Sequence, residues 1–161
     1  MFNIKTEFYL KIIFLFSFIA LISAFFIEYI LGHQPCNLCL IERIPYGLSI
    51  MIIMAIFLIR KNQKFLVMLL ILTFIFSFAI SFYHFGIEQG FFQESSVCGV
   101  KSSTEIVTKE DLLKQLSEKT ISCKDVTFRI FGLSLTSINI VISLLFIITL
   151  LKIFKKYEKN K

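Results

Sequence analysis

Four long runs without a charged residue constrain this chain more than any other feature. They cover residues 12–27, 44–59, 65–83 and 130–151, and their lengths are 16, 16, 19 and 22 residues. Apolar segments of about 20 residues cross the hydrocarbon core of a bilayer as helices. The runs therefore predict an all-α membrane protein, built as a bundle of four transmembrane helices.

The residues beside these runs set the expected bounds of the spans. The second span is short, because 16 residues rise about 24 Å against a core of about 30 Å, unless its helix begins near the preceding cysteines. Pro45 suits the first turn of that helix, where a missing N–H has no partner to lose. We expect one integral membrane domain over residues 1–161, with spans at about 10–31, 44–59, 65–83 and 130–151.

The composition agrees with a membrane protein and excludes a nucleic-acid binder. Hydrophobic residues make up 57% of the chain, against about 45–50% in soluble domains. The net charge is +6, but the basic residues do not gather into one patch with aromatic residues among them. Ten of the 17 Lys and Arg residues flank the spans: Lys5, Lys11, Arg60, Lys61, Lys64, Lys152, Lys155, Lys156, Lys159 and Lys161.

The same basic residues predict the orientation of the chain. Lys and Arg accumulate on the cytoplasmic side of membrane proteins. The N-terminal lead, the turn at 60–64 and the C-terminal tail are basic, whereas loop 84–129 carries six basic and seven acidic residues. We therefore expect cytoplasmic termini, with loops 32–43 and 84–129 on the outer side of the membrane.

The second outer loop, residues 84–129, is expected to carry a short amphipathic helix. Thr108 is placed to cap it, with Asp111 as the acidic third residue. Leu112, Leu113 and Leu116 form an apolar stripe. Such a helix lies flat on the bilayer or packs on the rest of the loop, and the sequence favours neither arrangement.

Cys36 and Cys39 form a C-x-x-C motif in the first outer loop, residues 32–43. Such pairs have lowered thiol pKa values and exchange disulfides readily. The alternatives are a structural clip and half of a zinc site. Structural zinc takes four ligands at close spacings, and the sequence offers one close pair. We expect a redox-active pair and no metal site.

The other two cysteines, Cys98 and Cys123, lie 25 residues apart in the second loop. Two isolated cysteines on the oxidising side of a membrane usually form a structural disulfide. Here the C-x-x-C pair faces the same compartment, so the two pairs can also exchange with each other by thiolate attack.

Arg43 and His84 are further candidate site residues. Arg43 lies four residues after Cys39, which places both on one face of a helix, where a cation stabilises a thiolate. An interfacial anchor is an equally good interpretation of Arg43. Haem would need paired histidines inside spans, and both His33 and His84 fall at span edges.

Taken together, these residues resemble the disulfide bond formation protein B (DsbB) family of bacterial inner-membrane oxidoreductases, over nearly the whole chain. The resemblance rests on the C-x-x-C followed by Glu42 and Arg43, on Tyr83-His84-x-Gly86-x-Glu88, on Cys98 and Cys123, and on Gly132-Leu133-Ser134 with Asn139.

The resemblance implies a relay of electrons from protein thiols to a membrane quinone. A periplasmic thioredoxin-fold oxidase of the DsbA type would attack the Cys98–Cys123 disulfide at Cys98. Electrons would pass to Cys36–Cys39 through a transient bond between Cys123 and Cys36. Cys39 would face a bound ubiquinone or menaquinone, with Arg43 polarising the quinone and His84 near its ring.

Two other classes of protein compete with this interpretation. A small transporter for soft metals would need cysteines or ionisable residues within the spans to pass the ion onward, and the uncharged runs contain none. A structural membrane subunit with passive disulfides would tolerate loss of Cys36 without loss of activity.

Overall fold

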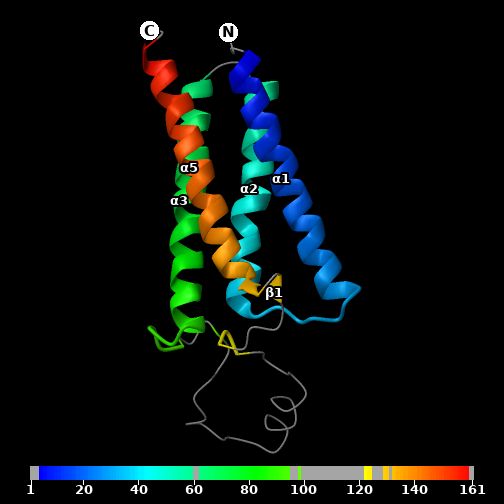
Figure 1. Cartoon of the computed structure of the whole chain (residues 1–161). Coiled ribbons are helices and arrows are strands. Elements are labelled where there is room, and N and C mark those ends of the chain that lie inside the picture. Colours follow the sequence, from blue (N-terminus) through cyan, green and yellow to red (C-terminus); the bar gives the residue numbers. More distant parts are fainter. Residues whose placement is uncertain are drawn as a thin grey trace, which may run out of the picture.

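The computed structural model describes residues 4–59, 62–94, 98, 122–124, 129–130 and 132–159. The described chain is a bundle of long helices (Figure 1). These are α1 (Ile4–Tyr29), α2 (Asn37–Leu58), α3 (Gln63–Glu88) and α5 (Leu135–Lys159). A two-stranded antiparallel ribbon, β1 (Arg129–Ile130) and β2 (Leu133–Ser134), leads into α5. The predicted all-α class and four helices long and apolar enough to span a membrane are confirmed. The last helix begins at Leu135 instead of the expected residue 130, because the strand pair precedes it.

The four helices suit a membrane by length and by composition. Each contains a stretch of at least 22 residues that is apolar enough to cross a bilayer. Their outward faces carry large exposed apolar side chains, such as Phe18, Met51 and Leu72. In water such faces would cost free energy, whereas lipid chains cover them without penalty.

The two ends of the bundle differ. α1 begins and α5 ends at one end, while the connection from α1 to α2, the last turn of α3 and the strand pair lie at the other (Figure 1). We call the second end the cysteine end, because Cys36 and Cys39 lie at the start of α2 there. This placement brings both cysteine-bearing connections to one end.

Helix α2 begins earlier than the expected 44–59, at Asn37, directly after Cys36. Its 22 residues rise about 33 Å, which matches the hydrocarbon core without thinning of the bilayer. The expectation that Pro45 lies in the first turn is therefore wrong, because Pro45 is inside the helix and buried. Pro45 has no N–H to donate to the carbonyl of Ile41, four residues earlier.

Small polar residues let the helices approach closely. Ser49 of α2 donates a hydrogen bond to Ser17 of α1 at 3.0 Å, and Ser77 of α3 lies 3.1 Å from Ser143 of α5. All four serines are fully buried. Small residues and hydroxyl pairs of this kind hold helices together in membranes, where apolar burial between helices gains little.

The bundle has one weakly packed seam. α5 packs along α3, α3 along α2 and α2 along α1, whereas α1 and α5 contact each other much less. Aromatic rings fill the centre: Phe146 contacts Phe74 edge to face at a centroid distance of 5.0 Å and Phe16 at 5.4 Å. Toward the cysteine end, the seam between α1 and α5 is left open for the cavity described below.

The amphipathic helix expected around Thr108 and Asp111 lies outside the described residues.

Candidate functional site

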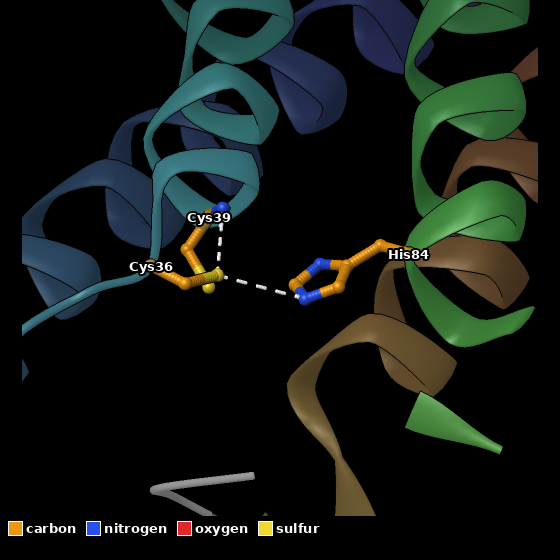
Figure 2. Close-up of side chains that lie close together, drawn as sticks. All are labelled: Cys36, Cys39 and His84. Atoms are coloured by element: carbon orange, nitrogen blue, oxygen red, sulfur yellow. Dashed lines mark hydrogen bonds between the residues drawn. The ribbon is translucent and has the colours of Figure 1, made fainter. Parts of the chain in front are cut away.

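Cys36 is the N-terminal cap of α2. Its extended backbone (φ −71°, ψ 164°) places the sulfur where it accepts a hydrogen bond from the backbone N–H of Cys39 at 3.3 Å (Figure 2). The first N–H groups of a helix lack partners within the helix, and the helix dipole is positive there. A sulfur in the cap position is therefore favoured as a thiolate.

This environment makes Cys36 unusually acidic. The hydrogen bond with the Cys39 side chain, with smaller contributions from His84, lowers the pKa of Cys36 from 9.0 to about 5, although burial opposes the shift. The Cys36 side chain is 6% exposed. Cys36 is thus poised as a thiolate at neutral pH.

His84 of α3 faces Cys36 across the helix interface. Its Nε2 lies 3.6 Å from the Cys36 sulfur, and its Nδ1 lies 2.9 Å from the Glu42 Oε1 (Figure 2 shows His84 pointing at the cysteine pair). The Glu42 carboxylate accepts the Nδ1–H, which leaves Nε2 to share a proton with the Cys36 sulfur. Cys36, His84 and Glu42 therefore form a nucleophile, a base and a group that orients the base.

Glu42 is itself held by a buried polar network. The side-chain amide of Asn139 on α5 donates to Glu42 Oε2 at 3.1 Å and to Ser81 at 2.6 Å. The hydroxyl of Tyr46 on α2 donates to the Asn139 side-chain oxygen. Residues of α2, α3 and α5 thus fix Glu42 beside His84, in a region where unpaired polar atoms would be costly.

A second carboxylate lies near His84. Glu88 Oε1 is 3.9 Å from His84 Nε2 and accepts a hydrogen bond from Thr136. Within the described ranges, Glu88 Oε2 is the buried side-chain oxygen that lacks a hydrogen-bond partner. His84 therefore sits between two glutamates near the cysteine end of α3.

Arg43 ties α1 to α2. It pairs with Glu28 near the end of α1, donates to the Ala24 carbonyl at 3.5 Å, and lies over the ring of Phe25 with its guanidinium carbon 5.3 Å from the centroid. Both side chains of the ion pair are largely buried. The guanidinium is thus fixed in position beside the start of α2.

Cys98 and Cys123 form a disulfide, with their Cα atoms 5.6 Å apart. Both are almost fully buried, in one packed cluster with Cys36, Leu38 and Ile87. Cys36 and Cys39 are reduced thiols in the structure. One oxidised pair and one reduced pair therefore lie within the same cluster at the cysteine end.

A cavity of about 330 Å³ opens beside the motif, in the seam between α1 and α5. Its walls come from four helices and the α1–α2 connection, and most of the α1 wall is apolar. Cys39, Arg43 and His84 all line it, with Glu42, Tyr46 and Asn139 as further polar groups. A mostly apolar cavity of this size with a few converging polar groups is typical of a small-molecule site.

The helices carry more ionisable groups than the uncharged runs implied. Because α2 and α3 extend beyond the expected spans, Glu42, Arg43, His84 and Glu88 all lie within them. They gather at the cysteine end. Within the described parts of the chain, the middles of the four helices hold no ionisable residue or cysteine that could carry a metal ion across.

Sequence reasoning missed the positions of Glu42, Glu88 and Asn139 in this site. All three belong to the pattern that carried the family resemblance, but no role followed from spacing alone. Glu42 lies three residues after Cys39, the spacing that puts two side chains on one helical face. An acidic residue at that spacing, beside a buried span, is the signal that could have found it.

Comparisons with known proteins agree with this arrangement. The family model described as "Disulfide bond formation protein DsbB" matches residues 6–153. The chain is also 32% identical over 147 residues to "Uncharacterized protein RP370" of Rickettsia prowazekii (strain Madrid E), covering 90% of this chain and 86% of that protein. The chain therefore belongs to the DsbB family, as a disulfide-bond-forming protein with several transmembrane helices.

Proposed function

We propose that this protein is a thiol:quinone oxidoreductase of the bacterial inner membrane. It reoxidises a periplasmic, thioredoxin-fold oxidase of the DsbA type and passes the electrons through two cysteine pairs to a membrane quinone, ubiquinone or menaquinone. The observation that carries this proposal is the shared position of Cys39, Arg43 and His84 on one cavity, with the Cys98–Cys123 disulfide packed against Cys36.

The proposed orientation places the cysteine end in the periplasm and both termini in the cytoplasm. The basic residues at the two ends of the chain support it, because Lys and Arg are retained on the cytoplasmic side. Disulfides also persist on the periplasmic side and are rare in the cytosol.

In the first half of the relay, the two thiols of the partner are oxidised. A partner thiolate attacks Cys98, and the second partner thiol then completes the partner's disulfide and leaves Cys98 and Cys123 as thiols. The Cys123 thiolate next attacks Cys36 of an oxidised Cys36–Cys39 pair, and Cys98 resolves that bond. Two electrons and two protons thus arrive at Cys36 and Cys39. The shared cluster of Cys36, Cys98 and Cys123 supports this exchange, since little movement separates the pairs.

In the second half, Cys36 and Cys39 are oxidised at the cavity. The residues present fit a quinone: the apolar α1 wall suits a ring and its tail, Arg43 is placed to donate to a ring oxygen, and His84 can donate from Nε2 once it has taken the Cys36 proton. When bound, a quinone would accept two electrons and two protons. The weakly packed seam between α1 and α5 gives this cavity a route to the lipid.

The residues around Cys36 stabilise its thiolate and accept its proton during that step. The N-terminus of α2 stabilises a thiolate at Cys36. His84 takes the Cys36 proton at Nε2 and is kept in the matching tautomer by Glu42. Arg43, held by Glu28, supplies a fixed positive charge on the cavity wall beside Cys39.

The test is a coupled assay on the purified protein in detergent. A reduced DsbA-type partner is mixed with ubiquinone or menaquinone, and partner thiols and quinone absorbance are followed together. Loss of two thiols per quinone reduced is expected, and Cys39→Ser abolishes both. If the disulfides do not react with the partner and the quinone is not reduced, the protein is not this enzyme, and a structural membrane subunit is the remaining interpretation.

A matched variant separates the two halves of the relay. Cys98→Ser should block oxidation of the protein partner, yet a small dithiol that reaches Cys36–Cys39 should still support quinone reduction. If Cys98→Ser oxidises the partner at the normal rate, the second cysteine pair has no part in the reaction.

A further inference from the structure

We propose that the reduced Cys36–Cys39 pair and His84 form a binding site for zinc. The sulfurs of the two cysteines and a ring nitrogen of His84 all lie within 4.8 Å of one another. In the sequence, Cys36 and Cys39 are the one close pair of possible ligands, and a single pair predicts no metal site. The fold adds a histidine from α3, 45 residues after Cys39, which spacing could not show.

The donor geometry is close to that of a metal site. Zn–S bonds of about 2.3 Å and Zn–N bonds of about 2.0–2.1 Å put tetrahedral ligands roughly 3.5–3.8 Å apart. His84 Nε2 is already 3.6 Å from the Cys36 sulfur. The three donors therefore need to close by about 1.3 Å at most, and two cysteines at C-x-x-C spacing suit this ion.

The surroundings of His84 also match a metal ligand. Metal-binding histidines usually donate their other ring N–H to a carboxylate, which fixes the tautomer and the direction of the ring. Glu42 Oε1 accepts from His84 Nδ1 at 2.9 Å, and Asn139 holds the other oxygen of Glu42. Nε2 is thus directed at the cysteine sulfurs, as Figure 2 shows.

Three protein ligands leave a fourth position on the ion. Cys39 and His84 line the cavity, so water can complete the coordination from there. Zinc needs thiolates, so only the reduced pair binds it, and binding releases the thiol protons. A pair that holds zinc has no lone thiolate to deliver electrons, so zinc and oxidation of the pair exclude each other.

The test measures metal binding directly, without turnover. The full chain with Cys98→Ser and Cys123→Ser, which leaves the C-x-x-C as the only thiols, is reduced, freed of reductant and titrated anaerobically with zinc against a chromophoric chelator. Cobalt(II) serves as the optical probe for thiolate ligands. We expect one ion per chain, protection of two thiols from alkylation, and loss of binding when the pair is oxidised.

Single substitutions in the same background identify the ligands. His84→Ala should weaken zinc binding at least tenfold, and Glu42→Gln, which alters the support of His84, by about 10–100-fold. His33→Ala is the matched control, since His33 lies on the cavity wall outside the three-donor group, and should bind zinc normally.

Two results would overturn the zinc site: equal binding by the reduced and oxidised chains, or equal loss in His33→Ala and His84→Ala. The comparison of the oxidised and reduced forms of this one chain needs no further substitution. Failure here is separate from failure of the relay, because a chain that oxidises its partner but never binds zinc keeps the proposed function and lacks the metal site.

Discussion

At the scale of single residues, the acidity of Cys36 is the property on which the site depends. A thiol reacts as its thiolate, so reactivity appears as the pH rises through the pKa. With a pKa of about 5, alkylation of reduced Cys36 should rise through pH 5 and stay constant above pH 7. Rate measurements with mass-spectrometric assignment of the labelled cysteine, in the presence of a chelator, check this. A midpoint near pH 8–9, as for an ordinary thiol, would show that the Cys39 side chain, His84 and the helix cap do not lower the pKa of Cys36.

The second residue-scale prediction concerns Glu42. Glu42→Gln removes a charge-assisted hydrogen bond to His84, worth about 1.5–3 kcal/mol, which corresponds to about one to two pH units. We expect the Cys36 alkylation midpoint to rise by up to that amount, and thiol oxidation to slow at pH 6. Glu28→Gln is the control, since Glu28 pairs with Arg43 instead of His84, and its midpoint should match the wild type. An equal rise in both variants would show that the contact between Glu42 and His84 is not its cause.

These residues also show how far sequence could predict the site. Cys36 and Cys39 were found from spacing, and Arg43 from its position one helical turn after Cys39, because those relations are local. The contacts of His84 with Cys36 and of Asn139 with Glu42 join residues 48 and 97 positions apart. No local pattern encodes which polar groups meet across a bundle, since that depends on the rotation of each helix about its own axis.

At the scale of elements, the cysteine motif determines where α2 begins. The expected bounds of α2, 44–59, were those of an uncharged run. A helix can begin before such a run, because charged residues are also compatible with a helix. Cys36 supplies the cap, and the helix begins at Asn37 with Glu42 and Arg43 inside it. The motif is therefore the first turn of a spanning helix, and the reactive sulfur receives the helix N-terminus as an electrostatic partner.

The segment after α3 depends on Gly86. The carbonyl of Gly86 accepts hydrogen bonds from the backbone N–H groups of Phe91 and Phe92, at 2.8 and 3.1 Å, so the chain folds back onto α3. The ring of Phe92 then lies where a side chain at residue 86 would be, and stacks on Tyr83 at a centroid distance of 5.7 Å. Glu94, a little further on, accepts from Ser122 and from the backbone of Lys124, next to Cys123.

Gly86→Ala should therefore destabilise the fold. The new methyl group overlaps the Phe92 ring, and overpacking of this kind costs about 1–3 kcal/mol. Gly47→Ala is a matched control in α2, because no atom lies within 4 Å of its added carbon and alanine favours a helix by about 1 kcal/mol over glycine. Thermal unfolding in detergent should show a lower Tm for the first variant and an equal or higher Tm for the second. A Tm unchanged by Gly86→Ala would mean that Phe92 moves aside freely.

At the scale of the whole molecule, the apolar core and the polar candidate site occupy opposite ends of the bundle. The half that holds the chain ends is filled by aliphatic and aromatic side chains around Phe74, whereas the cysteine end holds Glu42, His84, Glu88 and Asn139. This division could be predicted in outline, because the uncharged runs indicate the number of helices and the C-x-x-C motif lies between the first two runs. The open seam between α1 and α5 could not, since it arises from unequal packing among helices that are all apolar.

The seam leads to the last prediction, which concerns access from the bilayer. Ser23 of α1 lines the cavity and is exposed, so Ser23→Phe should narrow the cavity without disturbing the packed core. If the quinone enters there, its KM should rise about tenfold or more, while exchange between Cys98–Cys123 and the partner keeps its rate, because neither Cys98 nor Cys123 lines the cavity. Ile22→Phe places the same ring on the neighbouring, exposed position outside the cavity wall and should leave KM unchanged. Steady-state kinetics with varied quinone and a separate exchange assay measure both. An equal rise in KM for the two variants would assign the effect to the lipid-facing surface of α1 and would remove the seam as the entry route.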